Sequence, residues 1–208
     1  HTQKYQNQVH RKNSLEGKTE EFFKKAFHED FSTLIKDEVI EGQVYRMLAD
    51  NFRPDDISTF FKHILHFQGF DDLLRFERAE AYSKLVKVGD RFVLACGLWP
   101  ELATRGRVLN LGLRGYLNIS QEAYFNAASI GNKLDDKNSK EIMAIRKLGA
   151  NPKKVAFALF KLRAKYDPLI VFLPQYAKKE IVDVMNYGKP FEVNNSELGL
   201  IPINTTLH

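Results

Sequence analysis

Two histidines three positions apart, His63 and His66, are the first candidates for chemistry in this sequence. On a helix that spacing turns both imidazoles toward one side, where they can bind the same metal ion. A complete site needs further ligands from other helices, and the chain offers these candidates: His28, Glu29, Asp30, Glu38, Glu41, Glu77 and Glu80. The Glu-x-x-His motif of di-iron helical bundles is absent from the sequence. The pair therefore predicts either a metal site or two surface histidines on one helix.

The single cysteine, Cys96, lies in an apolar run with no charged residue between Phe92 and Pro100. A reactive thiolate needs electropositive, partly exposed surroundings and an aligned histidine, so we expect a buried structural thiol. Only a long-range pairing with His28 or His63 would make it reactive. The same region also offers a candidate pocket for a small apolar ligand, with ordinary core packing as the alternative: Cys96, Trp99, Tyr116 and Tyr124.

Basic residues gather in the C-terminal half of the chain. Residues 133–189 contain thirteen Lys or Arg and six Asp or Glu, although the net charge of the whole chain is only +5. On a helix, Lys154, Lys161 and Lys165 would share one face. A second group of basic residues lies around Gly112 and Gly115 in the sequence and could bind an anion: Arg105, Arg107 and Arg114. These residues predict either a surface for an anion, a nucleic acid or another acidic partner, or a solvated helix face.

Signatures of the common catalytic sites are missing from the sequence. It has no G-x-x-x-x-G-K-[ST], no G-x-S-x-G and no H-E-x-x-H, and Gly112 and Gly115 do not fit a dinucleotide loop. One cysteine excludes an intramolecular disulfide and a cysteine-rich zinc site, which favours a reducing, cytoplasmic setting. The longest apolar run, Leu169–Pro174, is far shorter than the roughly 20 residues that cross a bilayer. We therefore expect a non-catalytic protein without a cofactor or a transmembrane segment.

Apolar residues recur with helical spacing through the N-terminal half. Phenylalanines step by four over residues 23–31, which predicts a helix with one apolar side, and we expect Gly42 to mark a break further along. The next long helix is expected to stop near Gly89. A buried helix then follows, and it should end in a junction at Trp99-Pro100, because proline disrupts a helix interior.

The C-terminal half contains clearer helix signals. One helix should begin at a cap on Asn118 or Ser120, and another should cover residues 139–149. Asn151 is expected to cap a helix that Pro152 opens, since proline suits the first helical position. A last helix is expected over residues 174–188. The sequence shows no internal repeat and one strand-like run without a partner, so we predict an all-α fold, a compact bundle of about eight or nine helices.

The expected organisation is one helical domain between two irregular ends. Residues 1–13 are polar and form an N-terminal extension, and residues 191–208 have little periodicity and form a C-terminal tail. Residues 14–190 then make up the single domain. The alternative is that this domain divides into two parts near residue 88.

Part of the chain resembles a pattern found in uncharacterised bacterial helical proteins. That pattern has a Gly-Asp pair, an apolar run, a Gly-x-aromatic-Pro-Glu and a downstream Ala-Tyr pair. Residues 89–128 carry it here, and the matching positions are Gly89, Asp90, Gly97, Trp99, Pro100, Glu101, Ala123 and Tyr124. The resemblance implies a bacterial origin and a helical fold, and it brings no activity and no catalytic residue.

Three functions follow from these observations as expectations. The first is a non-catalytic helical interaction module for a protein partner or a small apolar ligand near Trp99-Pro100. The second is a helical-bundle metalloenzyme that uses His63, His66 and nearby carboxylates. The third is a nucleic-acid or anion binder that uses the basic residues 133–189.

Overall fold

A computed structural model describes residues 20–51, 57–104, 111–134, 140–166 and 183–184 of the chain. Within these ranges the regular structure is entirely helical, which confirms the predicted all-α fold. The chain divides into two compact units, residues 1–67 and residues 68–208, where the sequence had predicted one domain. None of the helices in the described part of the chain has the length and apolar character needed to cross a membrane.

The described residues of the first unit form three helices. They span residues 20–35, Glu38–Asn51 (α2) and Ile57–Leu65 (α3). The break between the first two lies at Lys36, whose φ of 51° is left-handed, and at Asp37. The Asp37 carboxylate accepts hydrogen bonds from the backbone N–H groups of Val39 (3.0 Å) and Ile40 (3.2 Å), and so caps α2. The expected break at Gly42 is wrong, because this capped turn precedes it and Gly42 lies inside α2.

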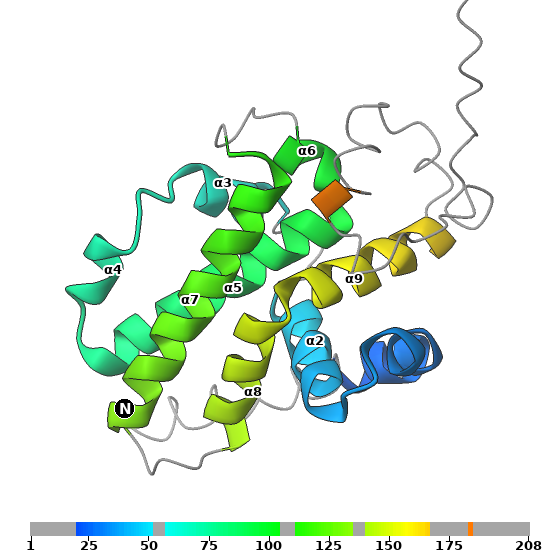
Figure 1. The fold of residues 1–208 in the computed structure, drawn as a ribbon, viewed down its shortest axis with the longest axis horizontal. Coiled ribbons are helices and arrows are strands. Elements are labelled where there is room, and N and C mark those ends of the chain that lie inside the picture. Colours follow the sequence, from blue (N-terminus) through cyan, green and yellow to red (C-terminus); the bar gives the residue numbers. More distant parts are fainter. Residues whose placement is uncertain (1–19, 52–56, 105–110, 135–139, 167–182, 185–208) are drawn as a thin grey trace, which may run out of the picture. The chain divides into compact units, whose positions relative to one another are not determined.

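The second unit is built around two long helices. In chain order its helices are α4 Asp71–Leu74, α5 Arg78–Leu98, α6 Pro100–Thr104, α7 Gly112–Leu134, α8 Lys140–Ala150 and α9 Pro152–Tyr166. Figure 1 shows α5 and α7 side by side, and they share the most extensive contact between helices in this unit. Helix α8 packs on α7, and α9 packs on α5. The core of the unit is therefore a layer of apolar side chains between these four helices.

Helix α5 continues through the glycine that was expected to end it. A Cβ atom on Gly89 would lie only 2.6 Å from Cε1 of the Tyr124 ring in α7. The glycine therefore allows two helices to approach closely, and the expected stop is corrected for that reason. The boundary considered near residue 88 falls inside this uninterrupted helix, and the two units meet in sequence between residues 67 and 68.

The junction at Trp99-Pro100 is confirmed. Helix α5 ends at Leu98, and Trp99 adopts a non-helical φ of −136° and ψ of 54° while its N–H still bonds to the Ala95 carbonyl. Pro100 then opens α6, where its missing N–H costs nothing because the first helical donors have no partner inside the helix. The chain thus turns at this point without leaving the core, since Pro100 is buried.

The two predicted C-terminal helices are found close to their expected limits. Pro152 opens α9 as predicted, and Asn151 precedes it as expected, since its carbonyl accepts a hydrogen bond from the N–H of Val155 (3.1 Å). The side-chain amide of Asn151 donates to the carbonyl of Lys147 (2.8 Å) at the end of α8. Helix α7 begins at Gly112, before the predicted caps at Asn118 and Ser120. The polar extension, the tail and all but two residues of the last predicted helix lie outside the described residues, and those two, 183 and 184, are helical.

Candidate functional site

A buried polar pair joins α5 to α7. The hydroxyl of Tyr124 donates to Oδ1 of Asp90 at 2.7 Å. Both residues are buried: Tyr124 is 0% exposed and Asp90 is 8% exposed. One turn earlier on α7, the Ser120 hydroxyl donates to the carbonyl of Gly89 at 2.9 Å. A buried carboxylate needs such a donor, because an unsatisfied charge in the interior is strongly unfavourable. This pair therefore fixes the register between the two helices.

A second polar pair fastens α9 to the Trp99-Pro100 junction. The Arg163 guanidinium in α9 binds Oε2 of Glu101 in α6 at 2.7 Å and also donates to the carbonyl of Leu98, the last residue of α5. The two charged side chains are 15% and 17% exposed. Close by, Gly97 faces α9, where an added Cβ would lie 2.5 Å from Cβ of Leu159. One cation thus binds a carboxylate and the carbonyl end of a helix together.

Seven of the eight residues of the sequence pattern therefore have structural tasks in this chain. Two glycines provide close helix contacts, two carboxylates bind Tyr124 and Arg163, Pro100 opens a helix, and Ala123 is fully buried. The pattern describes how α5 is held by α7 and α9.

The candidate pocket residues are used mainly for packing. Cys96 is fully buried, and its Sγ lies 3.8 Å from the carbonyl oxygen of Leu113. The Tyr116 ring is 1% exposed and packs against Phe92 with ring centroids 5.0 Å apart. Trp99 is half-buried. The buried thiol matches the expectation for Cys96, and the small apolar ligand stays a prediction.

His63 and His66 lie near the end of the short helix α3, and both are exposed. The Nδ1 atom of His66 is 2.7 Å from the carbonyl oxygen of Lys62, so a backbone group already occupies one of its nitrogens. Across the described ranges, no three His, Cys, Asp or Glu side chains gather closely enough to hold a metal ion. The metalloenzyme hypothesis gains no support from this part of the chain.

The predicted basic residues are divided between described and undescribed parts of the chain. Arg105 and Arg107 lie outside the described residues, and Arg114 is exposed on α7. Lys154 and Lys161 are half-buried, and Lys165 is exposed. Residues 140–166, which form α8, α9 and their connection, contain eight Lys or Arg and one Glu.

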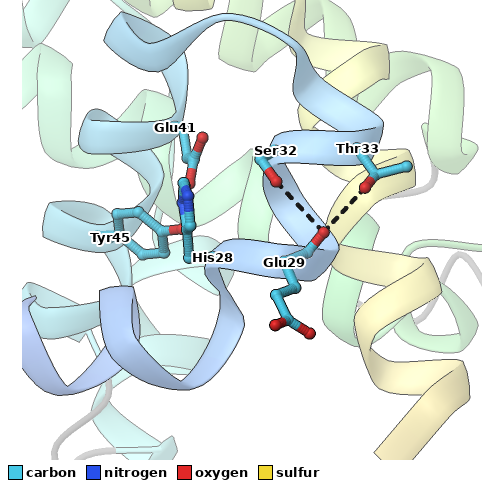
Figure 2. Close-up of polar contacts among 6 residues, drawn as sticks. All are labelled: His28, Glu29, Ser32, Thr33, Glu41 and Tyr45. Carbon is cyan, nitrogen blue, oxygen red and sulfur yellow. Dashed lines mark hydrogen bonds and ion pairs between the residues drawn. The ribbon is translucent and has the colours of Figure 1, made fainter.

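The first unit contains a polar cluster that sequence reasoning did not assemble. Figure 2 shows His28, from the helix at residues 20–35, meeting Glu41 of α2. Nδ1 of His28 is 2.6 Å from Oε1 of Glu41, and the hydroxyl of Tyr45 donates to the same oxygen at 2.5 Å. The Glu41 side chain is 6% exposed, whereas that of His28 is 58% exposed. A buried carboxylate therefore holds an imidazole that faces solvent.

This pairing depends on tertiary structure that the sequence does not display. His28 and Glu41 were each proposed as metal ligands, but they are thirteen positions apart on different helices. The signal that could have joined them is Asp37, a residue type that favours a helix start, which places a turn between them. With the break set at Gly42 instead, the two residues would have belonged to one helix.

Two of the buried tyrosines, Tyr45 and Tyr124, have raised pKa values. Burial is the main cause of the rise in the pKa of Tyr124, and the charge of Asp90 and its hydrogen bond add to it, while Ser120 acts in the opposite direction. Burial likewise raises the pKa of Tyr45, followed by the hydrogen bond from its hydroxyl to Glu41. In each case the neutral phenol is the form that donates to a carboxylate.

We expect the stability of the protein to fall above about pH 10, the ordinary pKa of tyrosine. The raised pKa of Tyr124 in the folded chain means that the unfolded chain loses its proton first as the pH rises. The stabilisation is therefore complete below that pH and declines above it, by about 1.4 kcal/mol per pH unit for one tyrosine. Urea unfolding at several alkaline pH values measures this slope. Tyr124→Phe should lower this slope by about 1.4 kcal/mol per pH unit and leave the contribution of Tyr45, whereas an unchanged slope would contradict the assignment.

Comparisons of this chain with protein-family models, with curated proteins and with solved structures found no match. The resemblance to bacterial helical proteins therefore stays a prediction.

Proposed function

We propose that this protein is a non-catalytic helical binding module that binds a nucleic acid through the basic face of α8 and α9. By the basic face we mean these side chains: Lys140, Arg146, Lys147, Lys153, Lys154, Lys161 and Lys165. The observation that carries the proposal is the ratio of eight basic residues to one acidic residue over residues 140–166. Such a concentration of one charge produces a positive potential that attracts a polyanion.

Aromatic rings lie among the lysines of α9. Lys154, Phe157, Lys161 and Lys165 follow one another at intervals of three or four residues, which places them along one side of the helix. Nζ of Lys161 is 5.8 Å from the centroid of the Phe157 ring, and Nζ of Lys165 is 5.2 Å from that of Tyr166. Proteins that bind single-stranded nucleic acids combine such cations, which follow the phosphates, with rings that stack on bases. This arrangement supports a nucleic acid over a partner that offers charge alone.

The expected binding is weak and sensitive to salt. The whole chain carries a net charge of only +5, so acidic residues elsewhere oppose the attraction at long range. At an ionic strength near 0.15 M, screening acts over about 8 Å, and only the cations next to the phosphates contribute fully. Low salt is therefore the condition in which binding should first be measured.

Charge reversal on the basic face tests this proposal. In Lys154→Glu/Lys161→Glu, the affinity for a fluorescein-labelled single-stranded oligonucleotide, measured by anisotropy at low salt, should fall about tenfold or more. The matched control is Arg46→Glu/Lys62→Glu, which changes the net charge equally at two exposed basic residues of the other unit. An equal loss in both variants would show that net charge alone matters. Tighter binding of polyglutamate than of the oligonucleotide would also overturn the proposal, in favour of an acidic protein.

A further inference from the structure

His28 has the geometry of an imidazole prepared to react at one nitrogen. Its Nδ1 lies 2.6 Å from a carboxylate oxygen of Glu41, a residue that is only 4% exposed. Tyr45 donates to the same oxygen, so the Glu41 carboxylate is held from two sides (Figure 2). The ring of His28 is thereby fixed by a group that cannot move away into solvent.

The buried carboxylate also determines which nitrogen carries the proton. An ionised Glu41 accepts hydrogen bonds only, so Nδ1 of His28 must donate to it. In the neutral imidazole, Nε2 then keeps its lone pair. With 58% of the His28 side chain exposed, an incoming reagent can reach this ring. The pair therefore combines a fixed tautomer with an accessible nucleophile.

The surroundings of His28 favour an anionic reagent that arrives from solvent. Lys24 and Lys25, both exposed, lie one helical turn before His28, where side chains three and four positions apart are neighbours. In Figure 2 the carboxylate of Glu29 points away from the imidazole. Two ammonium groups one helical turn from His28 suit the oxygens of a phosphoryl group, and the negative charge of Asp30, which acts on Tyr45, opposes them in part.

We propose that His28 accepts a phosphoryl group at Nε2 from a donor of the phosphoramidate class. The Nε2 lone pair attacks phosphorus and forms the new N–P bond. The donor nitrogen is protonated as –NH3+, so that when the P–N bond breaks, neutral ammonia leaves with the bonding electron pair. The ring retains its proton on Nδ1, and the Glu41 carboxylate balances the positive charge that develops on the phosphorylated imidazole. No oxidant, reductant or metal enters this step.

The full-length protein incubated with phosphoramidate provides the test. We expect site-resolved mass spectrometry to find an acid-labile phosphoryl group on His28, formed faster than on His66. His66 is a suitable internal comparison, because it is also exposed but its Nδ1 meets a backbone carbonyl instead of a carboxylate. His28→Gln should remove the modification at this site, and folding should persist because the side chain is largely exposed.

Glu41→Gln separates the charge of the carboxylate from simple exposure of His28. The glutamine oxygen can still accept the hydrogen bond from Nδ1, but it lacks the negative charge that balances the phosphorylated imidazole. We expect the rate of phosphorylation at His28 to fall about tenfold, with circular dichroism confirming that the helices remain. An unchanged rate in the folded variant would overturn the proposal, as would equal rates at His28 and His66 or no modification of the folded wild-type protein. His28 and the basic face belong to different units, so each proposal can fail without the other.

Discussion

Replacing Gly97 with alanine should destabilise the protein by about 2–3 kcal/mol. The new Cβ would lie 2.5 Å from Cβ of Leu159 and 2.8 Å from the carbonyl oxygen of Ala156. Both atoms are fixed by the backbone of α9, so no rotation of a side chain can relieve the clash. Helices α5 and α9 would have to separate, and the gain of about 1 kcal/mol in helix propensity offsets only part of that loss.

The free energy of unfolding in urea measures this effect, and two other glycines calibrate it. Gly89→Ala should also destabilise, because its Cβ would meet the buried ring of Tyr124. Gly42→Ala is the control: nothing lies within 4 Å of that position, so alanine in the middle of α2 should stabilise by about 0.5–1 kcal/mol. If Gly97→Ala proved as favourable as Gly42→Ala, the contact between α5 and α9 described above would be wrong.

Arg163→Met should cost about 2–4 kcal/mol, since it removes one partner of a largely buried ion pair. Methionine keeps much of the length of the side chain but leaves the carboxylate of Glu101 and the carbonyl of Leu98 without this donor. The stranded carboxylate accounts for most of the expected loss, because its desolvation is no longer compensated. The loss should therefore depend on the charge of Glu101.

The double variant Arg163→Met/Glu101→Gln tests that dependence. It should be more stable than Arg163→Met alone, because the buried negative charge is gone. The midpoint of urea unfolding at a constant m-value is the appropriate measurement. Additive losses from the two single substitutions would mean that Arg163 and Glu101 do not act together.

Local sequence signals predicted the elements that are set locally. Pro152 opens α9 and Pro100 opens α6 because the missing N–H of proline is harmless only at the start of a helix. The prediction that a helix ends at Gly89 was wrong, because glycine has two different uses in helical proteins. Glycine ends helices, and it also lets helices approach closely, and only the position of Tyr124 in α7 decides between them.

The candidate sites depended on contacts that are distant in sequence. The lysines of α9 were predicted to share a face, because helical periodicity fixes the positions of residues on one element. The pairing of Arg163 with Glu101 joins residues 62 positions apart, and no local pattern encodes it. His28 and Glu41 were recognised as residues capable of chemistry, but their meeting required the turn at Asp37.

The most direct test of the proposed nucleic-acid binding is the dependence of affinity on salt. A plot of log Kd against log salt concentration for a single-stranded oligonucleotide counts the phosphates that the protein neutralises. Relative to the wild-type protein, Lys154→Glu/Lys161→Glu should weaken binding and lower the slope of this plot by about 2, while Arg46→Glu/Lys62→Glu should leave the slope unchanged. Equal slopes for the wild-type protein and Lys154→Glu/Lys161→Glu would show that the basic face of α8 and α9 does not contact the nucleic acid.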